Sequence, residues 1–306
     1  VYAEPNGGVE PCGVFPNDPK FQSGEQWHLH NIGQAGGVLD ADIDAPEAWE
    51  ISRGSVQTRI GIIDSGVEAT HPDLSGRVSG DPPLVPSHRH GTNVAGIASA
   101  NTDNGVGIAG VDWHARIESQ RYTPLVDIDE ENDQQIATAI MEAVGAGSQI
   151  VNNSYRLTTA GAIDPTVGRY STTVRAVLSN AYKLNVCVIA AMGNDNTSNP
   201  QYPAAFAEGV IAVGATDRSD VRWSNSNYGA HIDVAAPGVD IVTTSANGTY
   251  IVGSGTSASA PMVAGVAGLM LAVNPSLYND DIEQIIRRTA DDLGSPGWDQ
   301  YYGTGR

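Results

Sequence analysis

The sequence predicts an α/β fold with a mainly parallel, twisted sheet flanked by helices on both faces. Short β-branched runs alternate with longer helical stretches, which is the pattern of a parallel sheet wrapped by helices. No repeat or linker divides the middle of the chain, so we expect one large domain over residues 17–306, preceded by a separate arm over residues 1–16. The expected strands cover residues 59–64, 115–122, 148–155, 186–192 and 209–216, and the expected helices cover 90–100, 133–146, 170–184, 257–273 and 277–290.

Two of the expected strands lead into polar residues that suit a functional site. Asp64 ends the apolar strand RIGIID before a tight Ser-Gly turn, and Asn194 follows the strand VCVIAAM. In open parallel sheets, functional groups gather beyond the carboxyl ends of the strands. Taken alone, Asp64 would serve equally as a cap or as a ribose ligand, and Asn194 as an ordinary turn residue.

The helix expected at 90–100 starts with a histidine. In the run HGTNVAGIASA, His90 stands in the first turn, and Gly91, Ala95 and Gly96 allow neighbouring backbone to approach closely. A lone histidine in such a place is more often structural than catalytic.

The stretch GSGTSASAPMVAGVAGLM at 253–270 predicts a helix buried on every side. We expect Pro261 in its first turn, where the missing N–H has no partner to lose. Ser257 then stands at the mouth of the helix, where free backbone N–H groups and the positive end of the helix dipole face a bound group. On its own, Ser257 would be an ordinary N-cap.

Composition limits the classes of partner. The net charge of −19, from 35 acidic and 16 basic residues, disfavours nucleic acid and anionic membranes. Residues 241–279 carry no charge, but Gly, Ser, Asn and Pro interrupt them, and the apolar helix within them is expected to be too short to span a bilayer. We therefore expect a protein that does not cross a membrane. No signal peptide stands at Val1, so any targeting segment is expected to have been removed or left out.

Cys12 and Cys187 are the only cysteines, too few for a disulfide framework or a zinc site. Two interpretations remain open. A single disulfide would tie the arm to the domain; two unpaired thiols, with Cys187 buried in its strand, are favoured because a free cysteine behaves as a small core residue.

Ser257, His90 and Asp64 together match the needs of nucleophilic catalysis. A serine requires a base to become a nucleophile, and the base requires an acid to fix its tautomer. Each of the three residues stands at a strand end or a helix start. Coincidence explains this arrangement poorly.

The motifs IGIIDSGV, HGTNVAGI and GSGTSASAPMVAG resemble the three signature blocks of the subtilisin-like serine proteases (subtilases, peptidase S8 family), in the family's order Asp, His, Ser. The resemblance continues through DIDAPEAWE and DVAAPGVDIVTT to GWDQYYGTGR, and so covers nearly the whole chain. It implies a three-layer, subtilisin-like fold and a secreted, monomeric serine endopeptidase that hydrolyses peptide bonds through an acyl-enzyme. Asp64, His90 and Ser257 would form the catalytic triad, and Asn194 would supply the side-chain donor of the oxyanion hole beside the Ser257 N–H.

The resemblance also implies a substrate site. Ser154, Tyr155 and Arg156 would lie on the segment that pairs with the substrate as an added strand, and Arg156 stands where the family usually has Gly. Arg156 would cover part of the pocket for the residue before the scissile bond, and Gln201 would form a shallower, more polar floor. We therefore expect reduced preference for large aromatic side chains. Two further substrate-binding positions implied in this way are Ala191 and Gly193.

A structural calcium ion is a further implication of the resemblance. The residues expected to gather it are Asp18, Asp73 and Asp103 or Asn104, each of which alone would be a turn residue. The opening VYAEPN resembles the last strand of the family's inhibitory propeptide, which would act as inhibitor and folding chaperone. The closing YYGTGR stops short of the family's customary last helix.

Several alternatives stay open. The acidic run at 127–133 is more simply a solvated loop than a lining of the cleft. The same scaffold could carry out transpeptidation or macrocyclisation, or act as a catalytically silent calcium-dependent binding protein. The filled catalytic positions argue against a silent protein. A nucleotide site is disfavoured because no Gly-rich phosphate loop follows the first strand.

Overall fold

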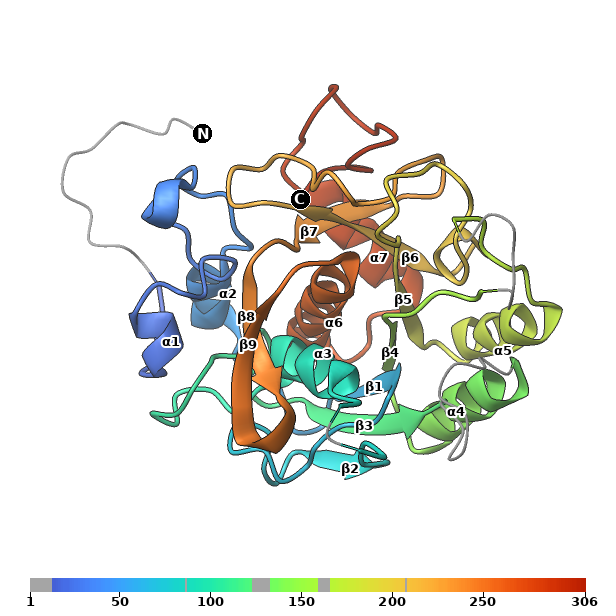
Figure 1. Ribbon diagram of the computed structural model, residues 1–306, viewed down its shortest axis with the longest axis horizontal. Helices are drawn as coiled ribbons and strands as arrows, with labels where there is room; N and C mark the ends of the chain where they lie inside the picture. Colours follow the sequence, from blue (N-terminus) through green and yellow to red (C-terminus); the bar gives the residue numbers. More distant parts are fainter. Residues whose placement is uncertain (1–12, 86, 123–132, 159–165, 207) are drawn as a thin grey trace.

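The centre of the fold is a seven-stranded sheet in the order β2-β3-β1-β4-β5-β6-β7, with every neighbouring pair parallel. The computed structural model describes residues 13–85, 87–122, 133–158, 166–206 and 208–306 (Figure 1). The strands are β1 (Arg59–Asp64), β2 (Val78–Gly80), β3 (Arg116–Arg121), β4 (Ile150–Asn153), β5 (Cys187–Ala191), β6 (Ile211–Thr216) and β7 (Val234–Pro237).

Helices cover both faces of this sheet (Figure 1). One face carries α3 (His90–Ser99), α6 (Thr256–Val273) and α7 (Asn279–Thr289), and the other carries α4 (Asp133–Gly145) and α5 (Thr172–Lys183). Successive strand residues point to opposite faces, so Ile62 packs with the α3 and α6 side chains while Ile63 packs with those of α4 and α5. Burial on both sides explains why the strands read as continuous apolar runs.

Smaller elements complete the described part of the chain. An antiparallel hairpin of β8 and β9 lies against α3 (Figure 1). These elements are α1 (Pro19–Gln22), α2 (Ala45–Ile51), β8 (Ile241–Ser245), β9 (Thr249–Gly253) and the 3₁₀ turns η1 (Gln34–Gly36), η2 (Ala204–Phe206) and η3 (Ala246–Gly248).

The predicted fold class is confirmed, and each of the five expected strands and five expected helices is present. The sequence analysis missed β2, β7, the β8–β9 hairpin and the two short helices α1 and α2. The division into an arm at 1–16 and a domain at 17–306 stays a prediction, because residues 1–12 lie outside the described residues.

Helix α6 corrects two expectations. It begins at Thr256, so Pro261 lies in its second turn rather than its first, and the Ser257 carbonyl has no N–H partner at that position. The helix reaches 18 residues with a mean hydropathy of 1.6, which is long and apolar enough to cross a membrane, contrary to the expectation that it was too short. However, 67% of it is buried inside the fold, where it contacts the five strands β1, β4, β5, β6 and β7, so packing as a core helix accounts for its composition.

The close packing of α6 predicts that residue 265 must be glycine for full stability. A Cβ added there would lie 2.5 Å from the Cβ of Val111 and 2.8 Å from the carbonyl oxygen of Ala98. We expect Gly265→Ala to lower the free energy of unfolding by about 1–3 kcal/mol, because the core must shift to admit the methyl group. Urea unfolding measures this change.

The matched control is Gly145→Ala at the end of α4, where an added Cβ meets no atom within 4 Å. It should leave stability unchanged or raise it by up to about 1 kcal/mol, because alanine restricts the unfolded chain. Equal effects of the two substitutions would contradict the packing argument.

Candidate active site

Asp64 and His90 form a charge-assisted pair at the carboxyl end of β1. The His90 Nδ1 lies 2.9 Å from Oδ1 and 2.8 Å from Oδ2 of Asp64. The carboxylate is buried, with 2% of its side chain exposed, whereas 47% of the His90 side chain is exposed. The imidazole is therefore held at Nδ1 by the carboxylate, while much of the rest of its side chain is accessible to solvent.

The loop after β1 fixes this pair to helix α3. Ser65 Oγ accepts a hydrogen bond from the Gly91 N–H at 3.0 Å and donates one to the His88 carbonyl at 3.1 Å. A Cβ on Gly91 would lie 2.5 Å from the Gly66 carbonyl oxygen, so only glycine lets the first turn of α3 approach this closely. The expected role of Gly91 in close backbone approach is confirmed.

The charge of Asp64 raises the pKa of His90 above its ordinary value, with a further contribution from their hydrogen bond, while desolvation of the imidazole opposes the rise. A histidine in this setting is a stronger base than free imidazole. It can accept a proton and stay charged beside the carboxylate.

Asn194 and Ser257 meet at the start of α6. Asn194 Oδ1 accepts hydrogen bonds from the N–H and the hydroxyl of Thr256, both at 2.9 Å, and the Thr256 hydroxyl accepts the Gly193 N–H at 3.0 Å. With its oxygen held, the orientation of the amide is fixed, and a Cβ built on Gly255 would lie 3.3 Å from both Asn194 Nδ2 and Ser257 Oγ. The amide donor and the hydroxyl therefore flank Gly255, and both residues line the same cavity.

Two cavities meet at Ser257. One, of about 100 Å³, has His90, Gly255 and Ser257 in its wall. The other, of about 240 Å³, has Ser257 and Asn194 in its wall. Within the described residues no hydrogen bond joins Ser257 to His90, and none takes the Ser257 N–H; bonds of the first kind commonly tighten only when substrate binds.

The structure places most of the expected substrate residues around the 240 Å³ cavity. The residues of this group in its wall are Ser154, Tyr155, Arg156, Ala191 and Gly193. Gln201 is different, since it is buried behind Gly193, where its Cγ would lie 3.4 Å from a Cβ on that glycine. Its Nε2 donates to the Thr166 carbonyl, and Gln201 is not among the described residues that line the cavity, so its role as the floor stays a prediction.

The sequence profile described as the Subtilase family matches residues 56–305. The chain belongs to the subtilase family. This subtilase is 36% identical over 309 residues to Thermophilic serine proteinase of Bacillus sp. (strain AK1), covering 99% of this chain and 70% of that relative. It is also 36% identical over 298 residues to Thermitase of Thermoactinomyces vulgaris, covering 95% and 96% of the two chains. Among solved structures, the prenylagaramide maturation protease PagA matches with a TM-score of 0.74 and 25% identity, over 86% of this chain and 94% of that one.

Asn227 holds the loop of this subtilase that carries Asn194, a role that the sequence analysis did not predict. Asn227 is fully buried; its Oδ1 accepts the Asp195 N–H at 2.9 Å and the Thr197 N–H at 3.2 Å, and its Nδ2 donates to the Met192 carbonyl at 3.0 Å. These bonds fix the backbone on both sides of Asn194. The signal in SNSNYG is weak, because an Asn in a polar stretch usually marks a turn.

The residues expected to hold calcium do lie together. Asp18 and Asp73 are fully buried, and the Asp18 carboxylate accepts the Asp103 N–H at 2.8 Å and the Asn104 N–H at 3.3 Å. Asn104 Nδ2 donates to Asp73 Oδ1 at 3.3 Å. Burial, with the neighbouring charge of Asp73, raises the pKa of Asp18 to about 6. In the described part of the chain no group of three or more His, Cys, Asp or Glu side chains is arranged as a metal site.

Two other expectations fall partly outside the described residues. Cys187 is free and buried, and burial raises the pKa of its thiol to about 12, whereas Cys12 is not described. Residues 127–132 of the acidic run are likewise not described. Its last residue, Asp133, begins α4 and pairs with Arg169.

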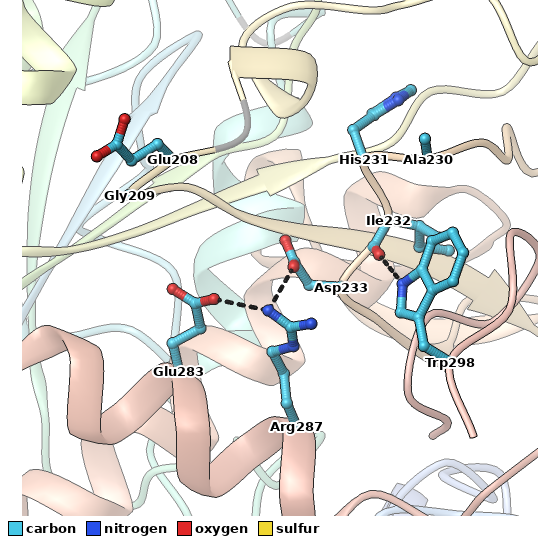
Figure 2. A pocket seen from close by; sticks show the side chains of 9 residues that line it. All are labelled: Glu208, Gly209, Ala230, His231, Ile232, Asp233, Glu283, Arg287 and Trp298. Carbon is cyan, nitrogen blue, oxygen red and sulfur yellow. Dashed lines mark hydrogen bonds and ion pairs between the residues drawn. The ribbon is translucent and has the colours of Figure 1, made fainter.

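A larger cavity, of about 450 Å³, shares no lining residue with the two cavities at Ser257. Figure 2 shows three of its charged groups turned towards one another: Arg287 lies 3.4 Å from Asp233 and 3.0 Å from Glu283. The Trp298 indole is fixed by a 2.9 Å hydrogen bond to the Ile232 carbonyl. These pairs stabilise the junction between α7 and β7, and we assign the cavity no part in the chemistry.

The Asp64–His90 pair predicts a change in titration. Because the Asp64 charge is the main cause of the raised pKa of His90, Asp64→Asn should move the protonation of His90 to lower pH. NMR of the imidazole carbon signals against pH measures the midpoint directly and does not depend on residual activity.

His231 serves as the internal control in the same spectra. Burial alone lowers its pKa, so its midpoint should not respond to Asp64→Asn. An unchanged His90 midpoint would show that the carboxylate does not set the basicity of the imidazole.

Proposed function

We propose that this subtilase is a serine endopeptidase that cleaves peptide bonds through an acyl-enzyme on Ser257, with His90 as base and Asp64 as the acid that orients it. The observation that carries the proposal is the convergence of the Asp64–His90 pair, the Ser257 hydroxyl and the Asn194 amide on two adjoining cavities. Family membership supports it, as does the similarity to two relatives, a thermophilic serine proteinase and Thermitase.

The residues divide the reaction as follows. His90 Nε2 takes the hydroxyl proton as Ser257 Oγ attacks the substrate carbonyl, and later gives that proton to the leaving amine. Asp64 keeps Nδ1 protonated and stabilises the imidazolium that forms. Asn194 Nδ2 and the free Ser257 N–H donate to the oxyanion, which exists in the transition state and not in the substrate. Water then hydrolyses the ester by the same route.

Substrate chains would bind along the segment 154–156 as an added strand, with the side chain before the scissile bond entering the 240 Å³ cavity. We further propose that the protein works outside the cell as a monomer, and that its own propeptide inhibits it and assists its folding. The strong negative charge favours solubility and does not favour nucleic acid or anionic membranes as partners.

Labelling with a fluorophosphonate tests the nucleophile. We expect a single adduct on the peptide that contains Ser257, and none in Ser257→Ala. Labelling at another residue, or persistent hydrolysis of peptides by purified Ser257→Ala, would contradict the proposed mechanism.

Asn194→Ala tests the oxyanion donor. Removing one such donor should lower kcat by about 10²–10³-fold with little change in KM, because the contact is made mainly in the transition state. Asn180→Ala, at an exposed position on α5, is the matched control and should keep wild-type kinetics. A loss in KM alone would assign Asn194 to substrate binding.

Calcium is the cofactor we propose for the Asp18–Asp73 cluster. Carboxylate and amide oxygens are the ligands that Ca²⁺ prefers, and within the described residues each carboxylate oxygen of Asp18 accepts one N–H, which leaves lone pairs for a metal. The buried charges of Asp18 and Asp73 repel each other, and a cation between them would offset that repulsion. Asp103 and Asn104 would add oxygens from the facing loop.

The melting temperature with and without a calcium chelator tests this site. Excess EDTA should lower Tm by about 5–10 °C relative to free calcium at a hundredfold its Kd, and calcium should restore Tm where magnesium does not. In Asp18→Asn the effect of EDTA should be much smaller. An unchanged Tm in EDTA would remove calcium from the proposal.

A second candidate activity is transfer of the acyl group to an amine in place of water. The structural similarity to a protein titled a maturation protease is the observation in its favour. Mass spectrometry of products made in the presence of a competing peptide amine separates the two, since transfer yields a new, heavier peptide and hydrolysis does not.

A further inference from the structure

An ion pair lies beside Ser257, between two residues that line the 240 Å³ cavity. Arg156 comes from the segment after β4, and Asp195 comes from the loop after β5, next to Asn194. The guanidinium Nη1 donates to Asp195 Oδ2. Apart from this pair, the described residues that line the cavity are uncharged.

The two charges are held differently. The backbone N–H of Asp195 is bonded to the buried Asn227, so this carboxylate is placed by the same residue that places Asn194. Among the described residues, Arg156 has no side-chain partner besides Asp195. The side chains are 34% and 23% exposed, so solvent screens the pair only partly.

We propose that the Arg156–Asp195 pair makes the cavity at Ser257 selective for uncharged side chains before the scissile bond. Each charged group of the pair is bound to the other, so neither is available to a charged substrate side chain. This inference rests on the proposed peptidase activity. A substrate lysine would need Asp195, but the tethered Arg156 already competes for it. A substrate glutamate would need Arg156, and Asp195 both holds that group and repels the incoming carboxylate.

Removing one partner of the pair should therefore create a preference for one charge, and removing the other partner should create the opposite preference. Removing Arg156 leaves Asp195 as an unpaired anion in the wall, which favours Lys or Arg before the scissile bond. Removing Asp195 leaves Arg156 as an unpaired cation with five N–H donors, which favours Glu or Asp. A structural role of the pair would instead affect all substrates alike.

The experiment compares peptides that differ only in the residue before the scissile bond, which is Ala, Lys or Glu. The readout is the ratio of kcat/KM for each charged peptide to that for the alanine peptide. In Arg156→Ala the lysine ratio should rise about fivefold or more and the glutamate ratio should not rise; in Asp195→Ala the reverse is expected. The double variant should show neither gain.

Two further variants serve as controls, one for net charge and one for the polarity of the pair. Arg218→Ala removes an arginine from a surface pair with Asp240, and so changes the net charge as Arg156→Ala does without touching the cavity; its ratios should match the wild type. The exchange Arg156→Asp with Asp195→Arg restores a pair of opposite polarity and should return both ratios towards wild-type values.

The outcomes separate this inference from the proposed function. If the alanine peptide is cleaved and Ser257 is labelled, but neither single variant changes its ratio or both variants change the two ratios equally, the inference is wrong and the peptidase stands. If the wild type cleaves none of the peptides and Ser257 resists labelling, the proposed function fails, and the inference fails with it.

Discussion

The parallel pairing of β1, β4 and β5 is the constraint on which the site depends. Because parallel strands end at the same edge, the residues that follow them must emerge side by side: Ile63 of β1 pairs with Asn153 of β4, which pairs in turn with Ala190 of β5. Asp64, the substrate segment at 154–156 and the loop of Asn194 therefore share one edge. None of these groups could meet without the crossovers that keep the strands parallel.

Helix α6 adds Ser257 to this edge through Thr256. The Thr256 N–H and hydroxyl bond Asn194, and its hydroxyl oxygen accepts the Gly193 N–H, so the loop after β5 and the start of α6 form one unit. Asn227 fixes the other side of that loop. Ser257 and Asn194, the proposed nucleophile and oxyanion donor, are thus positioned by the same network, and His90 is positioned separately by Asp64 and Ser65.

The sequence predicted the sheet and its main helices, because apolar runs and periods are local signals. The candidate site residues came from three short motifs and their resemblance to a known family. The sequence could not predict the short, partly exposed strands β2 and β9, whose residues carry no strong apolar pattern. Asp195 was missed for a similar reason. Its role comes from a contact with Arg156, 39 positions away, and no local pattern encodes that contact. The hydrogen bond from Gln201 Nε2 to the Thr166 carbonyl likewise joins residues 35 positions apart, and no local pattern predicts it.

The start of α6 violates local rules in a way that packing explains. Gly255 precedes the helix, Ser257 is a modest helix former, and Pro261 removes a hydrogen bond in the second turn, so the isolated segment would be a poor helix. Burial among the side chains of α3 and strands β4 to β7 offsets these defects. Each defect also serves the site: a side chain at Gly255 would crowd Asn194 Nδ2 and Ser257 Oγ, which lie 3.3 Å from its Cβ position. Because its tertiary packing is this extensive, α6 tolerates residues of low helix propensity at its N-terminal end. Such conflicts between local propensity and tertiary structure are expected at functional sites.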